Sequence, residues 1–195
     1  MKRMHALVIL LIIGTSGIAQ EKEKTPSVPT ISTETGLVGK WKADTSTLAM
    51  DDSRAVALYV DAEEQLAISS PLTGTSTSIT PQLFVRCRQG KFEVYVHIGY
   101  PASVEVHRSL LTIHAQDHTV RLRIDSQKAF SERWRNSTDL CSFFAPHPKE
   151  IAKSTASAQK LAFEFTPFVG TPTVLTFDVR GLDHNLNVAM AACKK

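Results

Sequence analysis

Three cysteines carry the clearest covalent chemistry in the sequence: Cys87, Cys141 and Cys193. No CxxC pair occurs, which argues against a zinc ribbon and against a thioredoxin-type redox motif. Cys87 ends the apolar set of a predicted core strand, and Cys193 falls on the inward face of a predicted last helix. We therefore predict a Cys87–Cys193 disulfide that joins this helix to the sheet. The alternative is three buried thiols that act as small hydrophobic groups.

Nucleophilic catalysis finds little support in the sequence. A Cys–His enzyme would need a histidine that activates Cys141, and the nearby His147 has no feature that places it against the thiol. The chain has neither a GxSxG elbow nor a phosphate-binding glycine loop. Residues 137–139 (Ser-Thr-Asp) fit a turn held by side-chain hydrogen bonds. We expect no catalytic residues, no cofactor and no enzymatic activity.

Metal binding is also not predicted. His114, Asp117 and His118 share a short polar stretch, but their spacing does not match the helical HExxH pattern. We expect them in a loop, facing solvent. Asp51 and Asp52 lack the spacing of a calcium loop, so we expect them to turn the chain into the following strand.

The first residues have the order of an export signal. Lys2 and Arg3 precede an unbroken apolar run over residues 7–13 and a small, turn-prone stretch over residues 14–19. The apolar run is short for a membrane span, which takes roughly 20 residues. We predict a cleaved signal peptide over residues 1–19, no stable membrane anchor after cleavage, and a periplasmic or secreted product.

The rest of the chain divides into two parts. Residues 20–36 are polar and have no apolar period, as in a flexible linker, and residues 37–195 have the pattern of a single β-rich domain. Hydrophobic residues make up 43% of the chain, which is enough for a core. Without Lys2 and Arg3, the 22 basic residues fall to 20 against 19 acidic ones. This near balance does not favour a nucleic-acid partner.

Period-two alternation dominates the predicted domain. It predicts a hairpin whose arms, residues 83–88 and 92–98, meet at a Gln89–Gly90 turn. Further strands are expected over residues 55–60, 120–125, 130–135, 161–165 and 174–179, a long loop over 65–80, and helices over 148–158 and 182–193, the last capped by Asp183. We expect a mostly β fold, with sandwich-like antiparallel sheets and two short helices, one of which closes the C-terminus.

Several short motifs occur in a familiar order. They are Trp41 followed by MDDSR (50–54), LFVRC (83–87) with VYV (94–96), RID (123–125), Trp134 with STD (137–139), FTPF (165–168), TFDVRGL (176–182), and AC (192–193). In these motifs the chain resembles the type VI secretion-associated VasI family over residues 37–195. The resemblance implies a periplasmic accessory protein and brings no established enzymatic activity.

These observations favour an interaction protein. We expect an exported periplasmic accessory protein that is associated with type VI secretion and has an unidentified protein partner. We place its binding surface on the exposed side of the hairpin. Its residues there are Arg86, Arg88, Tyr95 and His97, because Tyr and Arg are enriched in interface hot spots. The alternative is a periplasmic protein that binds a small molecule or cell-wall glycan through exposed aromatic side chains.

Overall fold

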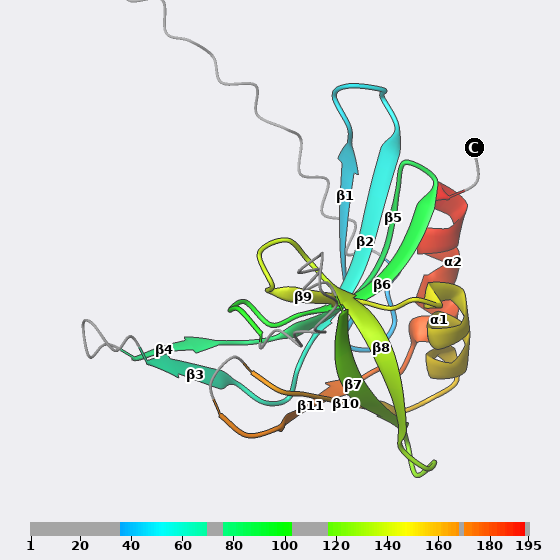
Figure 1. Cartoon of the computed structure of the whole chain (residues 1–195). Helices are drawn as coiled ribbons and strands as arrows, with labels where there is room; N and C mark the ends of the chain where they lie inside the picture. The colour runs from blue at the N-terminus through cyan, green and yellow to red at the C-terminus, as the bar shows by residue number, and fades with distance from the viewer. Residues whose placement is uncertain (1–35, 70–75, 103–116, 168–169, 194–195) are drawn as a thin grey trace, which may run out of the picture.

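A computed structural model describes residues 36–69, 76–102, 117–167 and 170–193. The predicted signal peptide and all but the last residue of the predicted linker lie outside these ranges. Within them, nine strands form one antiparallel sheet in the order β1-β2-β5-β6-β9-β8-β7-β10-β11, and β3 pairs with β4 in a separate hairpin (Figure 1).

The elements follow one another as two groups of strands separated and closed by helices. They are β1 (Lys42–Thr47), β2 (Arg54–Asp61), β3 (Leu66–Ser69), β4 (Ser76–Ile79), β5 (Gln82–Arg88), β6 (Lys91–His97), β7 (Asp117–Ile124), β8 (Phe130–Asn136), β9 (Ser142–Phe144), α1 (Pro148–Ala156), β10 (Lys160–Phe165), β11 (Thr173–Asp178) and α2 (Leu182–Ala192). The predicted fold class, mostly antiparallel β with two short helices, is confirmed.

The sheet folds over so that its two halves face each other across the core. At one side the end of β2 reaches β11, where Ala62 forms a bridge with Phe177 and the Glu63 N–H donates to the Thr176 carbonyl at 2.8 Å. The sandwich-like arrangement therefore comes from one continuous, strongly bent sheet. Helices α1 and α2 lie side by side against β2, β5 and β6 and close the core there (Figure 1).

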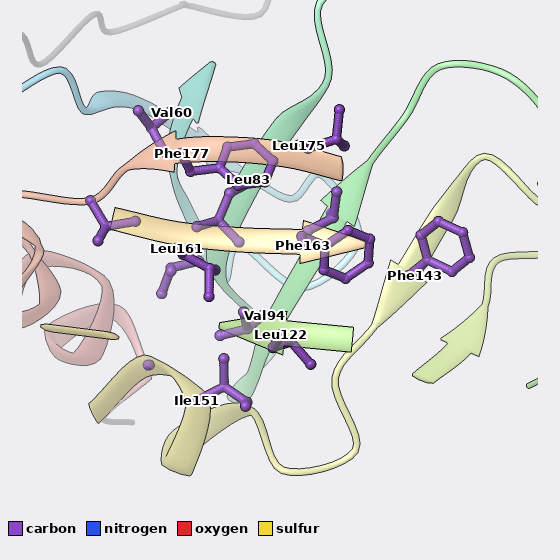
Figure 2. Close-up of a cluster of buried hydrophobic side chains, with 14 of the residues drawn as sticks. Val60, Leu83, Val94, Leu122, Phe143, Ile151, Leu161, Phe163, Leu175 and Phe177 are labelled. Carbon is purple, nitrogen blue, oxygen red and sulfur yellow. The ribbon is translucent and has the colours of Figure 1, made fainter. Parts of the chain in front are cut away.

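Strand alternation decides which side chains enter the core. Leu83 on β5, Leu161 on β10 and Phe177 on β11 are 0–1% exposed and belong to one cluster (Figure 2). Ile151 of α1 extends into the same cluster from the helix side (Figure 2). Burying one such side chain contributes about 1.5–3 kcal/mol, so this cluster supplies much of the stability of the fold.

The two helices begin differently. Helix α1 starts with Pro148, whose missing N–H costs nothing in a first turn, and Glu150 lies near its positive end. The predicted cap of α2 by Asp183 is wrong, because Gly181 occupies the N-cap position and Asp183 already lies in the first turn. Gly181 has φ +87°, and a Cβ on it would lie 2.5 Å from the Val38 carbonyl oxygen. Helix α2 therefore begins after a glycine, which has no side chain that could cap the helix.

Two other expectations need correction. The predicted loop over residues 65–80 contains the hairpin of β3 and β4, held by four paired positions from Leu66–Ile79 to Ser69–Ser76. His118 does not face solvent in a loop: it lies on β7, is 1% exposed, and its Nε2 accepts the Thr166 N–H at 3.3 Å. His114 lies outside the described residues.

Candidate functional site

A line of residues crosses the outer face of the sheet, the face that turns away from the core. Strand register places each member directly beside the next, in the order Lys42, Tyr59, Phe84, Tyr95, Phe144 and Arg135. We call its four rings, Tyr59, Phe84, Tyr95 and Phe144, the aromatic row. The row runs over β2, β5, β6 and β9 and ends in a cation on β1 at one side and on β8 at the other.

The same alternation that builds the core leaves these rings outside it. On β5, Leu83 and Val85 are buried while Phe84 and Arg86 are half-buried on the opposite face. Only Tyr95 is nearly covered, at 9% exposed. The row is therefore a solvent-facing surface that is partly shielded by its own neighbours.

The rings stack on one another. Centroids lie 5.3 Å apart for Tyr59–Phe84, 4.7 Å for Phe84–Tyr95 and 4.9 Å for Tyr95–Phe144, with ring planes at 26°, 2° and 25°. Nearly parallel rings this close must overlap face over face, because rings lying side by side in one plane are too wide to approach so far. Each of the two central rings therefore has an offset-stacked ring on both neighbouring strands.

Cations cover the ends of the row. Lys42 Nζ lies 5.7 Å from the Tyr59 ring centroid, and the Arg135 guanidinium carbon lies 5.9 Å from that of Phe144. Arg86 lies 4.8 Å from the Tyr95 centroid, within the range of a cation–π interaction. These contacts restrict long side chains that are otherwise mobile, so the surface is organised before any partner arrives.

A carboxylate on β6 balances Arg86 and the nearby Lys91. Glu93 accepts hydrogen bonds from Arg86 and forms an ion pair with Lys91 at 2.8 Å. Burial alone would raise the pKa of Glu93, but the hydrogen bonds from Lys91 and Arg86 and their positive charges outweigh it and lower the pKa. Burial raises the pKa of Tyr95 above its usual range. At neutral pH the Tyr95 hydroxyl is therefore protonated and available as a hydrogen-bond donor.

A His–Ser contact lies beside the row. His97 Nδ1 is 2.9 Å from Ser142 Oγ, which resembles the start of a nucleophile–base pair. Ser142 is only 7% exposed, and among the described residues no carboxylate hydrogen-bonds to the other nitrogen of His97. The arrangement lacks the access and the third, orienting group that acyl transfer needs. It is better suited to fixing β9 against β6.

The predicted binding residues lie on this face. Arg86, Tyr95 and His97 come together on the outer side of the hairpin, and Tyr95 is a member of the aromatic row. Arg88 is exposed at the hairpin end, away from the rings. Sequence reasoning missed the other rings of the row, although each sits at an outward position of an alternating strand: Tyr59, Phe84 and Phe144.

The cysteines have distinct states. Cys87 and Cys193 form a disulfide, with Cα atoms 5.6 Å apart, and this bond ties the end of α2 to β5. Cys141 is free and half-buried, and burial together with the nearby Asp139 charge raises the pKa of its thiol. Stable disulfides are typical of oxidising compartments, so the folded domain is extracytoplasmic.

The other polar motifs form turns that side-chain hydrogen bonds stabilise. Asp51 accepts hydrogen bonds from both the N–H and the hydroxyl of Ser53, as expected for a turn into β2. Asp139 accepts the hydroxyl of Ser137 and the N–H of Cys141 at 3.0 Å, which forms the predicted turn over residues 137–139. In the part of the chain that the structure describes, no group of three or more His, Cys, Asp or Glu side chains is arranged to hold a metal ion.

A buried carboxylate paired with two exposed cations supports the start of the domain. The Asp178 side chain is 5% exposed, accepts Arg180 Nε at 2.8 Å, and lies 3.3 Å from Lys40 Nζ. The hydrogen bond from Arg180 holds the pKa of Asp178 well below its usual range, against the opposing effect of burial. Asn185 of α2 pairs with both the N–H and the carbonyl of Val38, at 3.0 and 2.8 Å. Together these contacts fix the first residues of the domain to α2 and β11.

Comparison with known proteins gives distant structural likenesses alone. The sequence matches no protein family and no curated protein. Among solved structures, the chain is similar to the crystal structure of invasion associated protein B from Bartonella henselae, with 13% identity and a TM-score of 0.48 over 80% of this chain and 96% of that chain. A similarity this distant is limited to the path of the backbone, and we draw no inference about function from it.

Among the helices of the described ranges, none is both long and apolar enough to span a bilayer.

Proposed function

We propose that this chain is a periplasmic interaction protein that binds a protein partner through the outer face of its sheet. The observation that carries the proposal is the aromatic row, stacked and held between Lys42 and Arg135. Tyr and Arg are enriched at the centres of protein interfaces, where rigid side chains lose little entropy on binding. The row offers four rings that are already ordered by one another.

The ring geometry favours a protein over a glycan as the partner. A sugar ring packs on the open face of an aromatic side chain, but Phe84 and Tyr95 have a stacked neighbour on both faces. What remains partly exposed is the three rings of Tyr59, Phe84 and Phe144, with the flanking cations at both ends of the row. Such a surface suits the mixed polar and apolar surface of a protein. It therefore favours a protein partner over a glycan.

The resemblance to the VasI family narrows the partner class. We extend the proposal to an accessory role beside a type VI secretion apparatus, with one of its periplasmic subunits as the partner. This part of the proposal is supported by the ordered sequence motifs alone. It is separable from the binding role, which is supported by the aromatic row.

Photo-crosslinking in the periplasm tests both parts. A photoreactive phenylalanine analogue at position 84 should give one discrete crosslinked product, and the same analogue at position 123, on the outer side of β7, should not. Lys42→Ala and Tyr59→Thr should each reduce the product. Arg121→Ala is the matched control, because Arg121 pairs with Glu164 at 2.9 Å much as Lys42 pairs with Asp61 at 2.7 Å.

The outcomes separate the two parts of the proposal. Equal yields from positions 84 and 123, or an equal effect of Arg121→Ala, would contradict binding through the aromatic row. A discrete product whose partner is not a secretion subunit would keep the binding role and remove the secretion role.

A further inference from the structure

An open groove of about 440 Å³ lies where β9 ends. Strand β9 has three residues and pairs with β6 at positions 95–97 and with β8 at positions 135 and 136. Residues of β6, of β8 and of the segment 144–148 that leads to α1 line the groove, together with Asp117 at the start of β7. Its volume is within the range of small-molecule binding sites, which is about 300–1,000 Å³.

One wall of the groove is apolar and fixed in place. It consists of Phe144, Ala145, Pro146 and Pro148. The Ala145 N–H donates to the Val94 carbonyl at 2.9 Å, which holds the start of this wall against β6. At the other end Pro148 is the first residue of α1. Because the proline rings also restrict the backbone, a ligand that packs on this wall meets a surface that is already ordered.

Most of the charged side chains that line the groove are paired with one another. Lys91 Nζ lies 2.8 Å from Glu93 Oε1, and Arg133 Nη2 lies 3.6 Å from Asp117 Oδ2. The remaining charged side chain of the lining is that of Arg135. With three cations and two carboxylates, the lining has a net charge of +1.

Arg135 provides this excess charge next to the apolar wall. Its guanidinium carbon lies 5.9 Å from the centroid of the Phe144 ring. Asp117 is its neighbour in the β7–β8 ladder, but the ion pair of Asp117 is with Arg133. In the part of the chain that the structure describes, no carboxylate forms an ion pair with Arg135. A planar guanidinium in this state is suited to bind a carboxylate from a ligand with two parallel hydrogen bonds.

We infer that the groove binds a small organic monoanion, in which one carboxylate is joined to an apolar or aromatic body. The carboxylate binds Arg135, and the body packs against Phe144 and Pro146. A single negative charge matches the net charge of the lining, whereas a second would find no cation without a partner of its own. This is a further function beside partner binding, and of the aromatic row it uses Phe144 alone.

Both parts of the ligand are needed. Arg135 is exposed, and an ion pair in contact with water contributes little by itself. The affinity must therefore come largely from the apolar body, while Arg135 determines its orientation and excludes neutral molecules of the same shape.

Fragment screening by NMR tests this inference. The library consists of matched pairs, each a carboxylic acid with an aromatic or aliphatic body and the primary amide of that acid, and it is titrated into the isotope-labelled, oxidised protein. Acids should bind, with the largest shifts at the Glu93 and Ala145 amides and at Arg135 Nε. Each amide should bind at least about tenfold more weakly than its acid, the usual effect of losing a charged hydrogen-bond partner. Acetate, which has no body, should bind more weakly than the acids that carry a ring.

Two variants of Arg135 and one control locate the effect. Arg135→Ala should weaken the binding of acids by about tenfold or more and leave the binding of amides unchanged. Arg135→Lys should retain part of the binding, because it keeps the charge but not the planar fork. Arg121→Ala removes another exposed arginine, on the outer face of β7, and should leave binding unchanged. The spectrum of each variant shows directly whether it is folded.

Three results would contradict the inference: no acid that binds in the groove, equal affinities of the acids and their amides, or equal losses from Arg121→Ala and Arg135→Ala. Acetate that binds as tightly as the ring-bearing acids would mean an adventitious ion only. Crosslinking from position 84 reads partner binding separately, so either proposal can fail without the other.

Discussion

Reduction of the Cys87–Cys193 bond should strongly destabilise the domain without changing its native structure. The bond joins positions 106 residues apart in sequence. In the chain-entropy treatment it restricts the unfolded chain, and a loop of this size gives about 4.8 kcal/mol at 25 °C. For a domain of this size, each 1 kcal/mol changes the melting temperature by roughly 2–4 °C, so the expected decrease is roughly 10–20 °C.

The assay compares oxidised and reduced protein in a Cys141→Ser background, because the free thiol of Cys141 is able to exchange with the bond. Reduction removes no heavy atom, so it leaves no cavity around Cys87, which is 0% exposed. Guanidinium unfolding is followed by the fluorescence of Trp134 and Trp41, both of which are buried. The reduced protein should also have a larger m-value, since its unfolded chain exposes more surface.

Two results would refute this reasoning. Equal midpoints for the oxidised and reduced protein would mean that the cross-link does not restrict the unfolded chain. A large loss of stability with a changed near-UV spectrum would place the effect in the folded state, as a detachment of α2. The Cys87→Ala/Cys193→Ala variant serves as a check, because it adds a small cavity and should be somewhat less stable than the reduced protein.

Three further perturbations concern the contacts that fix the start of the domain. Asp178→Asn should lower the free energy of unfolding in urea above about pH 5. Because the native pKa of Asp178 is lowered, the difference from wild type should shrink as the pH falls below about 4. A difference that stays constant with pH would contradict the ion-pair account. Gly181→Ala should cost at least about 1–2 kcal/mol, since the position has φ +87°; a neutral effect would show that the backbone relaxes easily. Asn185→Ala should lower the free energy of unfolding by about 2 kcal/mol, because it leaves both backbone polar groups of Val38 without their partner. The control Asn187→Ala, at an exposed position of the same helix, should be neutral. Equal effects of the two variants would contradict this account.

Local patterns predicted the strands that have one face in the core. The β5–β6 hairpin follows from alternation on both arms and from the Gln89–Gly90 turn, where both residues have positive φ as a tight hairpin turn requires. Cys87 lies on the buried side of that alternation, which is why the disulfide was predictable.

The missed features depend on partners far away in the chain. The strands β3 and β4 have four residues each and are mostly half-exposed or exposed, so neither shows a clear alternation of buried and exposed side chains. His118 is buried because it packs against Phe143, at 4.9 Å between ring centroids, and no local pattern indicates that contact. The aromatic row requires the strand order β2-β5-β6-β9, which joins segments separated by up to 85 positions, from Tyr59 to Phe144.

The position of the aromatic row bears on what it is for. The core already has its own aromatic group in Trp134, Phe143 and Phe163, all 0% exposed. Four more rings on the opposite face add only cross-strand stacking, which contributes about 0.5–1.5 kcal/mol for each pair, and they leave apolar edges in water. Thr would satisfy the strand equally well at these positions without that exposure. The arrangement therefore favours the proposed binding role over a role in folding alone.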